Sequence, residues 1–206
     1  MVTIERFYFD PQIFIIANYW ILNSSNLQFF LKLGCDSGFG FLTALTLLRA
    51  GYRVMAGCFS PDGEGAARLR KQATSIGESA TKRLHIESLD VTKEESVKEL
   101  FERVKSYLDD HPDQRLFALV NNAGVARLGL CEWGSLSNHF EQVFAVNFFG
   151  MVRMSRVFLP VLRSSNGSNK EFRIINLNSI LSRICMQPIV SYCASKHASV
   201  CECFSF

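Results

Sequence analysis

The sequence predicts an α/β fold: a doubly wound parallel sheet of about five strands with helices on both faces. Three observations support this prediction. A glycine-rich turn separates an apolar run from a helix, further short apolar runs alternate with helical stretches, and small polar residues directly follow several runs. Strands that alternate with helices favour parallel pairing. Ligands of such sheets bind at the carboxyl ends of the strands, so the polar residues there mark the expected site.

The composition fits one domain and narrows the classes of partner. The chain has 206 residues, of which 48% are hydrophobic and 20% charged, which is enough for a sizeable core. Its net charge of +3 comes from dispersed Lys and Arg residues, so no nucleic-acid partner is expected. The seven cysteines are scattered and form no C-x-x-C pair, which indicates free thiols and no metal site.

Residues 1–26 are predicted to be an apolar N-terminal extension, and residues 27–206 to be the sheet-forming domain. The run at 13–22 is apolar and aromatic, but it is shorter than the ~20 residues that span a bilayer. Tyr19 and Trp20 suit association with a membrane surface. An irregular extension fits the same residues equally well, and both interpretations stay open.

The first strand is predicted at Phe29–Leu31, followed by a glycine turn at Gly34–Gly40 and a helix from Phe41 to Ala50. Gly51 closes the helix, as glycine commonly does at a C-terminus. Glycines in such a turn permit a tight bend, close backbone approach to a pyrophosphate, and helix–strand packing. The helix N-terminus adds N–H groups and a positive dipole end. The unit therefore predicts a Rossmann-like dinucleotide-binding domain.

The next strands follow the same alternation. The second is predicted at Val54–Phe59 and ends at a Ser-Pro-Asp-Gly turn, after which a polar helix is predicted at Glu64–Ile76. The third strand is predicted at Leu84–Leu89. Thr92 and Glu95 then match a capping box, which predicts that a helix begins there.

The last two predicted strands each end at polar residues. The fourth, at Leu116–Val120, runs into the turn Asn121-Asn122-Ala123-Gly124. A long helical region is predicted from Asn138 to Leu162. The fifth strand, at Phe172–Leu177, leads into Asn178 and Ser179.

Tyr192 and Lys196 are four residues apart, so a helix would place both side chains on one face. A tyrosine has an ordinary pKa of ~10, which makes it a poor base at neutral pH. We expect the neighbouring ammonium to stabilise the phenolate and lower that pKa. The pair would then exchange a proton with an alcohol or carbonyl oxygen.

Taken together, these motifs resemble the short-chain dehydrogenase/reductase family. They comprise the glycine turn, Asp90 after the third strand, the Asn121–Gly124 turn, Asn147, Ser179, and the Tyr192–Lys196 pair, and the resemblance covers about Leu33 to His197. Gly34-Cys35-Asp36-Ser37-Gly38-Phe39-Gly40 with Ala56-Gly57-Cys58 is similar to the branch of retinol, hydroxysteroid and 3-hydroxybutyrate dehydrogenases.

The resemblance implies an NAD(P)-dependent oxidoreductase that interconverts a secondary or lipophilic alcohol and its carbonyl by hydride transfer. It implies four catalytic residues: Asn147, Ser179, Tyr192 and Lys196. The implied cofactor-binding residues are Gly34, Ser37, Gly38, Phe39, Gly40, Asp90, Val91, Asn121, Ala123, Gly124, Tyr192 and Lys196.

The branch resemblance favours NAD, and NADP stays open. Cys58-Phe59-Ser60 contains neither the acidic residue typical of NAD sites nor the arginine typical of NADP sites. The glycine turn contains no basic residue that could contact a 2′-phosphate. The expected partner is a small alcohol or carbonyl compound, with self-association into a homo-oligomer as a further hypothesis. The expected location is intracellular: at the endoplasmic reticulum or mitochondrion, or cytoplasmic.

Two features depart from the family pattern. Lys32 and Leu33 make the first strand irregular, and the sequence ends at Phe206, where the family continues with further strands. We therefore expect a C-terminally truncated family member, with a catalytically inactive fragment as the alternative to an active enzyme. An open edge on the Phe172–Leu177 strand and poor stability are expected for the same reason.

Overall fold

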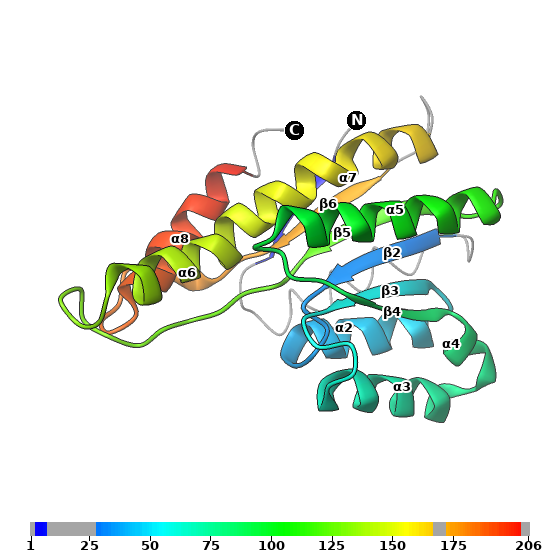
Figure 1. Ribbon diagram of the computed structural model, residues 1–206, viewed down its shortest axis with the longest axis horizontal. Helices are drawn as coiled ribbons and strands as arrows, with labels where there is room; N and C mark the ends of the chain where they lie inside the picture. The colour runs from blue at the N-terminus through cyan, green and yellow to red at the C-terminus, as the bar shows by residue number, and fades with distance from the viewer. Residues whose placement is uncertain (1–2, 8–27, 167–171, 203–206) are drawn as a thin grey trace.

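The computed structural model describes residues 3–7, 28–166 and 172–202 (Figure 1). Within them, six strands form one parallel sheet in the order β1-β6-β5-β2-β3-β4. The strands are β1 (Thr3–Phe7), β2 (Gln28–Leu33), β3 (Arg53–Cys58), β4 (Leu84–Ser88), β5 (Arg115–Asn121) and β6 (Arg173–Leu177). The α-helices are α2 (Gly38–Arg49), α3 (Glu64–Ile76), α4 (Glu78–Lys82), α5 (Glu94–Asp110), α6 (Gln142–Phe144), α7 (Met151–Asn166) and α8 (Val190–Glu202).

The sheet is doubly wound, as predicted. From β2 the chain moves outward through β3 to β4, then crosses back to place β5 on the other side of β2. The strand order therefore reverses between β2 and β5. The carboxyl ends of these two neighbours, at Leu33 and Asn121, flank the crevice where such sheets bind ligands.

The sixth strand lies in the segment predicted to be an extension. Strand β1 pairs in parallel with β6, with Thr3 opposite Arg173 and Phe7 opposite Leu177. The prediction of an open edge on the last strand is therefore wrong, because β1 covers it. The apolar run at 13–22 and its proposed membrane contact lie outside the described residues.

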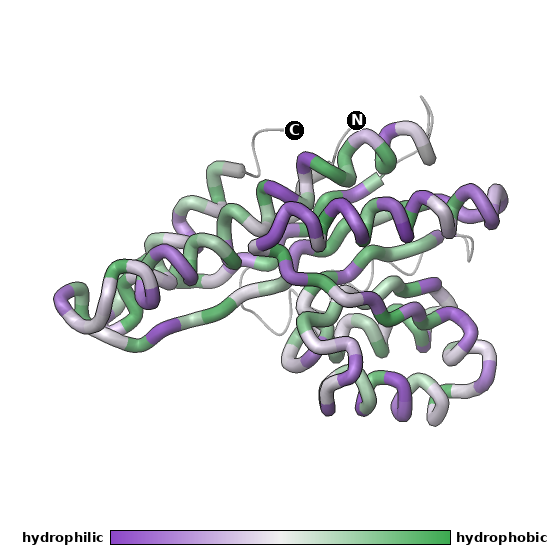
Figure 2. Tube along the Cα trace, in the orientation of Figure 1, coloured by the Kyte–Doolittle hydropathy of each residue, from purple (hydrophilic) through white to green (hydrophobic). Residues whose placement is uncertain are grey.

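Two helical layers bury the central strands. Phe30 and Val54 pack with α2 and α3 on one face, whereas Phe29 and Leu31 pack with α5 and α7 on the other. Figure 2 shows hydrophilic residues recurring along the outer helices α3 and α5. Burial on both faces explains why the central strands read as apolar runs.

Lys32 interrupts this pattern inside the most central strand. Its side chain is fully buried, and its Nζ atom has no hydrogen-bond partner among the described residues. Burial lowers the pKa of Lys32 from 10.5 to about 7. The irregularity predicted for the first strand is thus a buried amine beneath the glycine turn.

The helices at Glu64–Ile76 and after Asn138 form as predicted, but the capping box does not. The helix α5 begins at Glu94 with Lys93 at its N-cap, which makes no side-chain capping bond. Thr92 instead donates its hydroxyl to Asp90 Oδ1 at 2.6 Å. The Thr92 hydroxyl is thus bonded to Asp90 and does not form the capping box.

The long helical stretch is a core element of the sheet domain. It contains two π-helical segments, Ser137–Glu141 and Ala145–Gly150, around α6 and before α7. Among the described residues, Ser137–Ser164 alone has the length and hydropathy of a membrane span. Its buried residues, including Met154 and Phe158, pack against the sheet, as expected for a core helix.

Candidate functional site

The glycine turn between β2 and α2 has the conformation that its glycines permit. Gly34 and Gly38 have φ values of +63° and +57°, in the left-handed region that favours glycine. A Cβ atom on Gly40 would overlap the carbonyl oxygen of Gly34. A Cβ on Gly38, by contrast, would meet no protein atom within 4 Å, so the turn leaves open space at the N-terminus of α2.

Asn122 holds this turn in place, a role that the sequence did not single out. Its Nδ2 donates to the carbonyl oxygens of Leu33 at 2.9 Å and Gly34 at 3.1 Å. The turn after β5 thereby fixes the turn after β2 at the point where the strand order reverses. The adjacent Asn-Asn sequence was the available signal.

The turn fits a dinucleotide phosphate. Ser37, Gly38 and Phe39 are exposed, and Ser37 at the N-cap of α2 makes no side-chain capping bond. Open space over Gly38 meets the positive end of the α2 dipole, the arrangement that binds phosphate in Rossmann-type units.

Asp90 and Val91 form the next strand end. Burial alone would raise the pKa of Asp90, but hydrogen bonds from Thr92 and the Lys93 ammonium together lower the pKa below its ordinary value. Val91 is buried, and its carbonyl accepts a hydrogen bond of 2.6 Å from Arg153 Nη1. The Asp90 carboxylate is thus committed to its own turn, which leaves Val91 to line the site.

A small hollow joins the predicted cofactor side to the predicted catalytic side. Its lining residues come from β2, the turn after β4, β5, the long helix, β6 and α8: Leu33, Val91, Asn121, Ala123, Val146, Asn147, Met151, Leu177 and Lys196. Asn121 is buried and donates from Nδ2 to Asn176 Oδ1 at 2.7 Å. Gly124 lies beside the hollow, where a Cβ would be 3.5 Å from Asn147 Oδ1.

Asn147 links the turn after β5 to helix α8. In the Ala145–Gly150 π segment, its Oδ1 accepts from Val125 N at 2.8 Å, and its Nδ2 donates to Val125 O at 2.9 Å. The same Nδ2 lies 3.0 Å from Ser195 Oγ on α8. Asn147 is 2% exposed, so these bonds hold a buried junction.

Lys196 is fixed inside the site. Its Nζ donates to the Leu177 carbonyl at 2.9 Å, at the end of β6, and the residue is 5% exposed. Burial lowers the pKa of Lys196 from 10.5 to about 8. The Nζ atom is 5.7 Å from the centroid of the Tyr192 ring, so the predicted juxtaposition on one helical face is present.

Ser179 and Tyr192 meet across the site. Ser179 follows β6 and accepts a hydrogen bond from Leu181 N at 3.1 Å, which orients its hydroxyl at the start of a short turn. Burial raises the pKa of Tyr192, and a hydrogen bond with Ser179 opposes that rise without reversing it. The expectation that Lys196 lowers this pKa is therefore wrong for the protein alone, because burial dominates the shift and the opposing effect comes from Ser179.

Exposed apolar side chains surround this end of the sheet. Ile180, Ile184 and Met186 follow Ser179, and each is about half exposed. The loop after β5 carries exposed Leu128 and Trp133. It is linked to the loop that follows Ser179 by a hydrogen bond of 2.6 Å from Gly129 N to Pro188 O. Two loops with exposed apolar side chains therefore meet near the residues predicted to be catalytic.

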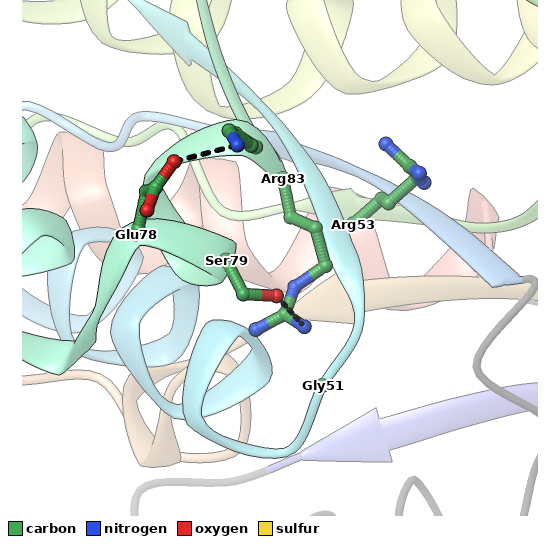
Figure 3. A pocket seen from close by; sticks show the side chains of 6 residues that line it. Gly51, Arg53, Glu78, Ser79 and Arg83 are labelled. Carbon is green, nitrogen blue, oxygen red and sulfur yellow. Dashed lines mark hydrogen bonds and ion pairs between the residues drawn. The ribbon is translucent and has the colours of Figure 1, made fainter.

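A second pocket lies near the amino end of β3, away from these residues. It has a volume of about 540 Å³ and lies between Gly51, Arg53 and the short helix α4. Figure 3 shows the Arg83 guanidinium directed at Ser79, to which it donates at 3.1 Å, while Arg53 extends away from both. Larger volume alone does not favour this pocket, because its one acid–base pair, Glu78 and Lys82, is a solvent-exposed ion pair within α4.

Known proteins of three activities match the chain at similar levels. It is 36% identical over 168 residues to rat estradiol 17-beta-dehydrogenase 2, covering 82% of this chain and 40% of that protein. It is 37% identical to rat mitochondrial D-beta-hydroxybutyrate dehydrogenase, covering 81% and 45%. For mouse retinol dehydrogenase 5 the identity is 37%, covering 79% and 46%. The chain thus spans less than half the length of these relatives.

Solved structures and a family model agree with the fold. A short-chain dehydrogenase from Streptomyces avermitilis has a TM-score of 0.70 and 26% identity, covering 85% of this chain and 58% of that chain. The short chain dehydrogenase family model matches residues 29–201, from β2 into the last turn of α8. The chain belongs to the short-chain dehydrogenase family, and the resemblance inferred from its motifs is confirmed.

Proposed function

We propose that this protein interconverts a secondary or lipophilic alcohol and its carbonyl by NAD(P)-dependent hydride transfer. Dehydrogenases of this family use NAD(H) or NADP(H). The observation that supports the proposal most directly is the single hollow at the strand reversal, which borders both Ala123 beside the glycine turn and Lys196 beside Tyr192. A coenzyme bound along this edge of the sheet would extend from the phosphate-binding turn toward the proposed acid–base group.

Tyr192 is the proposed acid–base group. In the reduction direction its phenol donates a proton to the carbonyl oxygen, and in oxidation the phenolate takes the proton of the alcohol. A bound nicotinamide coenzyme would supply or accept the hydride. The raised pKa of Tyr192 keeps the phenol protonated at neutral pH, which suits donation.

Ser179, Lys196 and Asn147 support that proton transfer. Ser179 would hydrogen-bond the substrate oxygen beside Tyr192 and stabilise the charge that develops there. Lys196 is held by the Leu177 carbonyl, from which position it would bind a ribose hydroxyl of the coenzyme. Asn147 holds α8 in register with the turn after β5 through Val125 and Ser195.

The substrate is proposed to be lipophilic. Ile184 and Met186, in the loop after Ser179, and Trp133, in the loop after β5, expose apolar surface that an apolar alcohol would cover. The relatives named for estradiol and retinol act on such molecules, whereas D-beta-hydroxybutyrate is small and polar. NAD is the proposed coenzyme. A mitochondrial location is proposed on the name of the D-beta-hydroxybutyrate dehydrogenase relative, and the endoplasmic reticulum, the cytoplasm and self-association stay hypotheses from the sequence.

Two measurements on one sample test this function. Fluorescence titration with NADH and NADPH should show saturable binding, and absorbance at 340 nm should report oxidation of a series of secondary alcohols of increasing apolar size. We expect turnover to rise with the apolar size of the alcohol. Nucleotide binding without turnover of any alcohol would contradict the proposed hydride transfer and leave nucleotide binding as the function. No binding of either nucleotide would overturn the proposal.

A further inference from the structure

The glycine turn carries a carboxylate that reaches across to the neighbouring strand. Asp36 Oδ2 accepts a hydrogen bond of 2.9 Å from Phe59 N, and its Oδ1 accepts one of 3.1 Å from Ser60 N. These two residues directly follow β3, which pairs with β2 in the sheet. One side chain thus occupies two consecutive N–H groups at the carboxyl end of β3.

This corner is where Rossmann-type units contact the ribose of the adenosine half. An acidic residue about 20 residues after the glycine fingerprint hydrogen-bonds the ribose 2′-hydroxyl in NAD sites, and an arginine there accommodates the 2′-phosphate of NADP. Cys58, Phe59 and Ser60 occupy that stretch and none of them is charged. The carboxylate missing from the end of β3 is supplied instead from the turn by Asp36.

The backbone of Asp36 is restrained by packing, in addition to the hydrogen bonds of its carboxylate. A Cβ on Gly65, in the first turn of α3, would overlap the carbonyl oxygen of Asp36. The start of α3 therefore packs directly on the Asp36 peptide from one side, while Phe59 N and Ser60 N hold the side chain from the other.

Two arginines of α3 already have partners, and the partner of Arg70 is Pro61, the residue that directly follows Ser60. On α3, the Arg68 guanidinium lies 5.2 Å from the centroid of the Phe41 ring, and Arg70 Nη1 donates to Pro61 O at 2.9 Å. A 2′-phosphate at this corner would face a carboxylate, and it would find both N–H groups already bonded. The repulsion between the two like charges would weaken binding of a 2′-phosphate.

We propose that Asp36 determines coenzyme choice, selecting a dinucleotide with a free 2′-hydroxyl and rejecting one with a 2′-phosphate. The inference rests on the proposed function, since it concerns the coenzyme of that same site. Asp36 holds the Phe59 and Ser60 N–H groups, and its remaining lone pairs accept from the ribose hydroxyl. Selection thus comes from within the glycine turn and not from the end of β3.

The test compares direct binding of NADH and NADPH to the whole chain by nucleotide fluorescence, without reference to turnover. Wild type should bind NADH more tightly than NADPH. Asp36→Asn removes the charge but keeps an oxygen that can accept one N–H, and it should raise NADPH affinity relative to NADH by on the order of 10-fold or more. Adding Ser60→Arg to this variant should shift the ratio further toward NADPH. Such a gain in affinity cannot result from misfolding.

Asp62→Asn is the matched control, because Asp62 is an exposed acid in the turn after β3. It loses the same charge but should leave the NADPH to NADH ratio within about twofold of wild type, since exposed charges interact weakly. Equal binding of both nucleotides by wild type, an unchanged ratio in Asp36→Asn, or an equal shift in Asp62→Asn would each overturn this inference alone. A wild-type chain that binds neither nucleotide would overturn the proposed function as well.

Discussion

The glycine turn and the proposed catalytic side of the site owe their shapes to different parts of the chain. The glycine-turn side is shaped by backbone: positive φ at Gly34 and Gly38, and the absence of a side chain at Gly40. The catalytic side is shaped by side chains that bond to backbone, as Asn147 does to Val125 and Lys196 does to Leu177. Substitutions that add atoms should therefore disrupt the glycine turn, whereas substitutions that remove atoms should disrupt the proposed catalytic side.

Removing one oxygen atom from the catalytic side should have the largest effect. Tyr192→Phe deletes the proposed proton donor and should lower turnover by ~10²–10⁴-fold, because general acid–base groups contribute on that scale. NADH affinity, measured by titration, should change by less than about threefold. Tyr107→Phe is the control, since the Tyr107 hydroxyl is buried without a hydrogen-bond partner in the described part of the chain. Near-full turnover in Tyr192→Phe would place the proton donor elsewhere.

Adding one methyl group to the glycine turn should have different effects on stability at Gly38 and at Gly40. Gly40→Ala forces a Cβ into the Gly34 carbonyl and should destabilise the fold by about 3 kcal/mol, at the upper end of overpacking costs. Gly38→Ala has open space and should cost only ~1 kcal/mol for its left-handed backbone, yet weaken NADH binding. Urea unfolding and NADH titration of both variants give the comparison. Equal destabilisation would show that packing at Gly40 is not limiting.

The two buried lysines sharpen the contrast further. Lys196 has the Leu177 carbonyl as a partner, whereas Lys32 has none, and burial lowers the pKa of Lys32 to about 7. Between pH 7 and 10.5 the unfolded chain binds the Lys32 proton more tightly than the folded chain, so stability rises with pH across that window. Each pH unit within it is worth up to ~1.4 kcal/mol.

Lys32→Met should remove that penalty. We expect the free energy of unfolding at pH 7 to increase by roughly 2 kcal/mol, because a buried unpaired amine is replaced by an apolar chain of similar length. Its rise between pH 7 and 9 should become smaller, and the remaining part should come from Lys196, whose pKa burial lowers to about 8. Lys196→Met should instead destabilise, since it leaves the Leu177 carbonyl without its donor. Urea unfolding at both pH values tests the pair. A Lys32→Met variant less stable than wild type at pH 7 would contradict the burial penalty.

The central strands were predictable because burial on both faces leaves an apolar run in the sequence. Strand β1 has the sequence Thr-Ile-Glu-Arg-Phe, which contains no such run, and it became visible only as a partner of β6. An edge strand needs one neighbour and leaves a weaker signal. The helix at Glu64–Ile76 was predictable from the turn before it, while the short helix α4 behind it was not.

The distant backbone partners of Asp36 and Asn122 could not be predicted from the sequence. Asp36 binds N–H groups 23 and 24 residues later, and Asn122 binds carbonyls almost 90 residues earlier. Spacing did identify Tyr192 and Lys196 as neighbours, but spacing does not report burial. The direction of the Tyr192 pKa therefore required the structure.

The π segment at Ala145–Gly150 sets the rotational phase of α7. Each residue of an α-helix turns the chain by about 100°, so the wider π turn fixes where the apolar stripe after it points. That stripe includes Met154, Phe158 and Leu162, all fully buried. Losing one residue from the segment would turn the stripe away from the sheet, although no side chain of the stripe had changed. At this place the length of the helix, more than its composition, is under constraint.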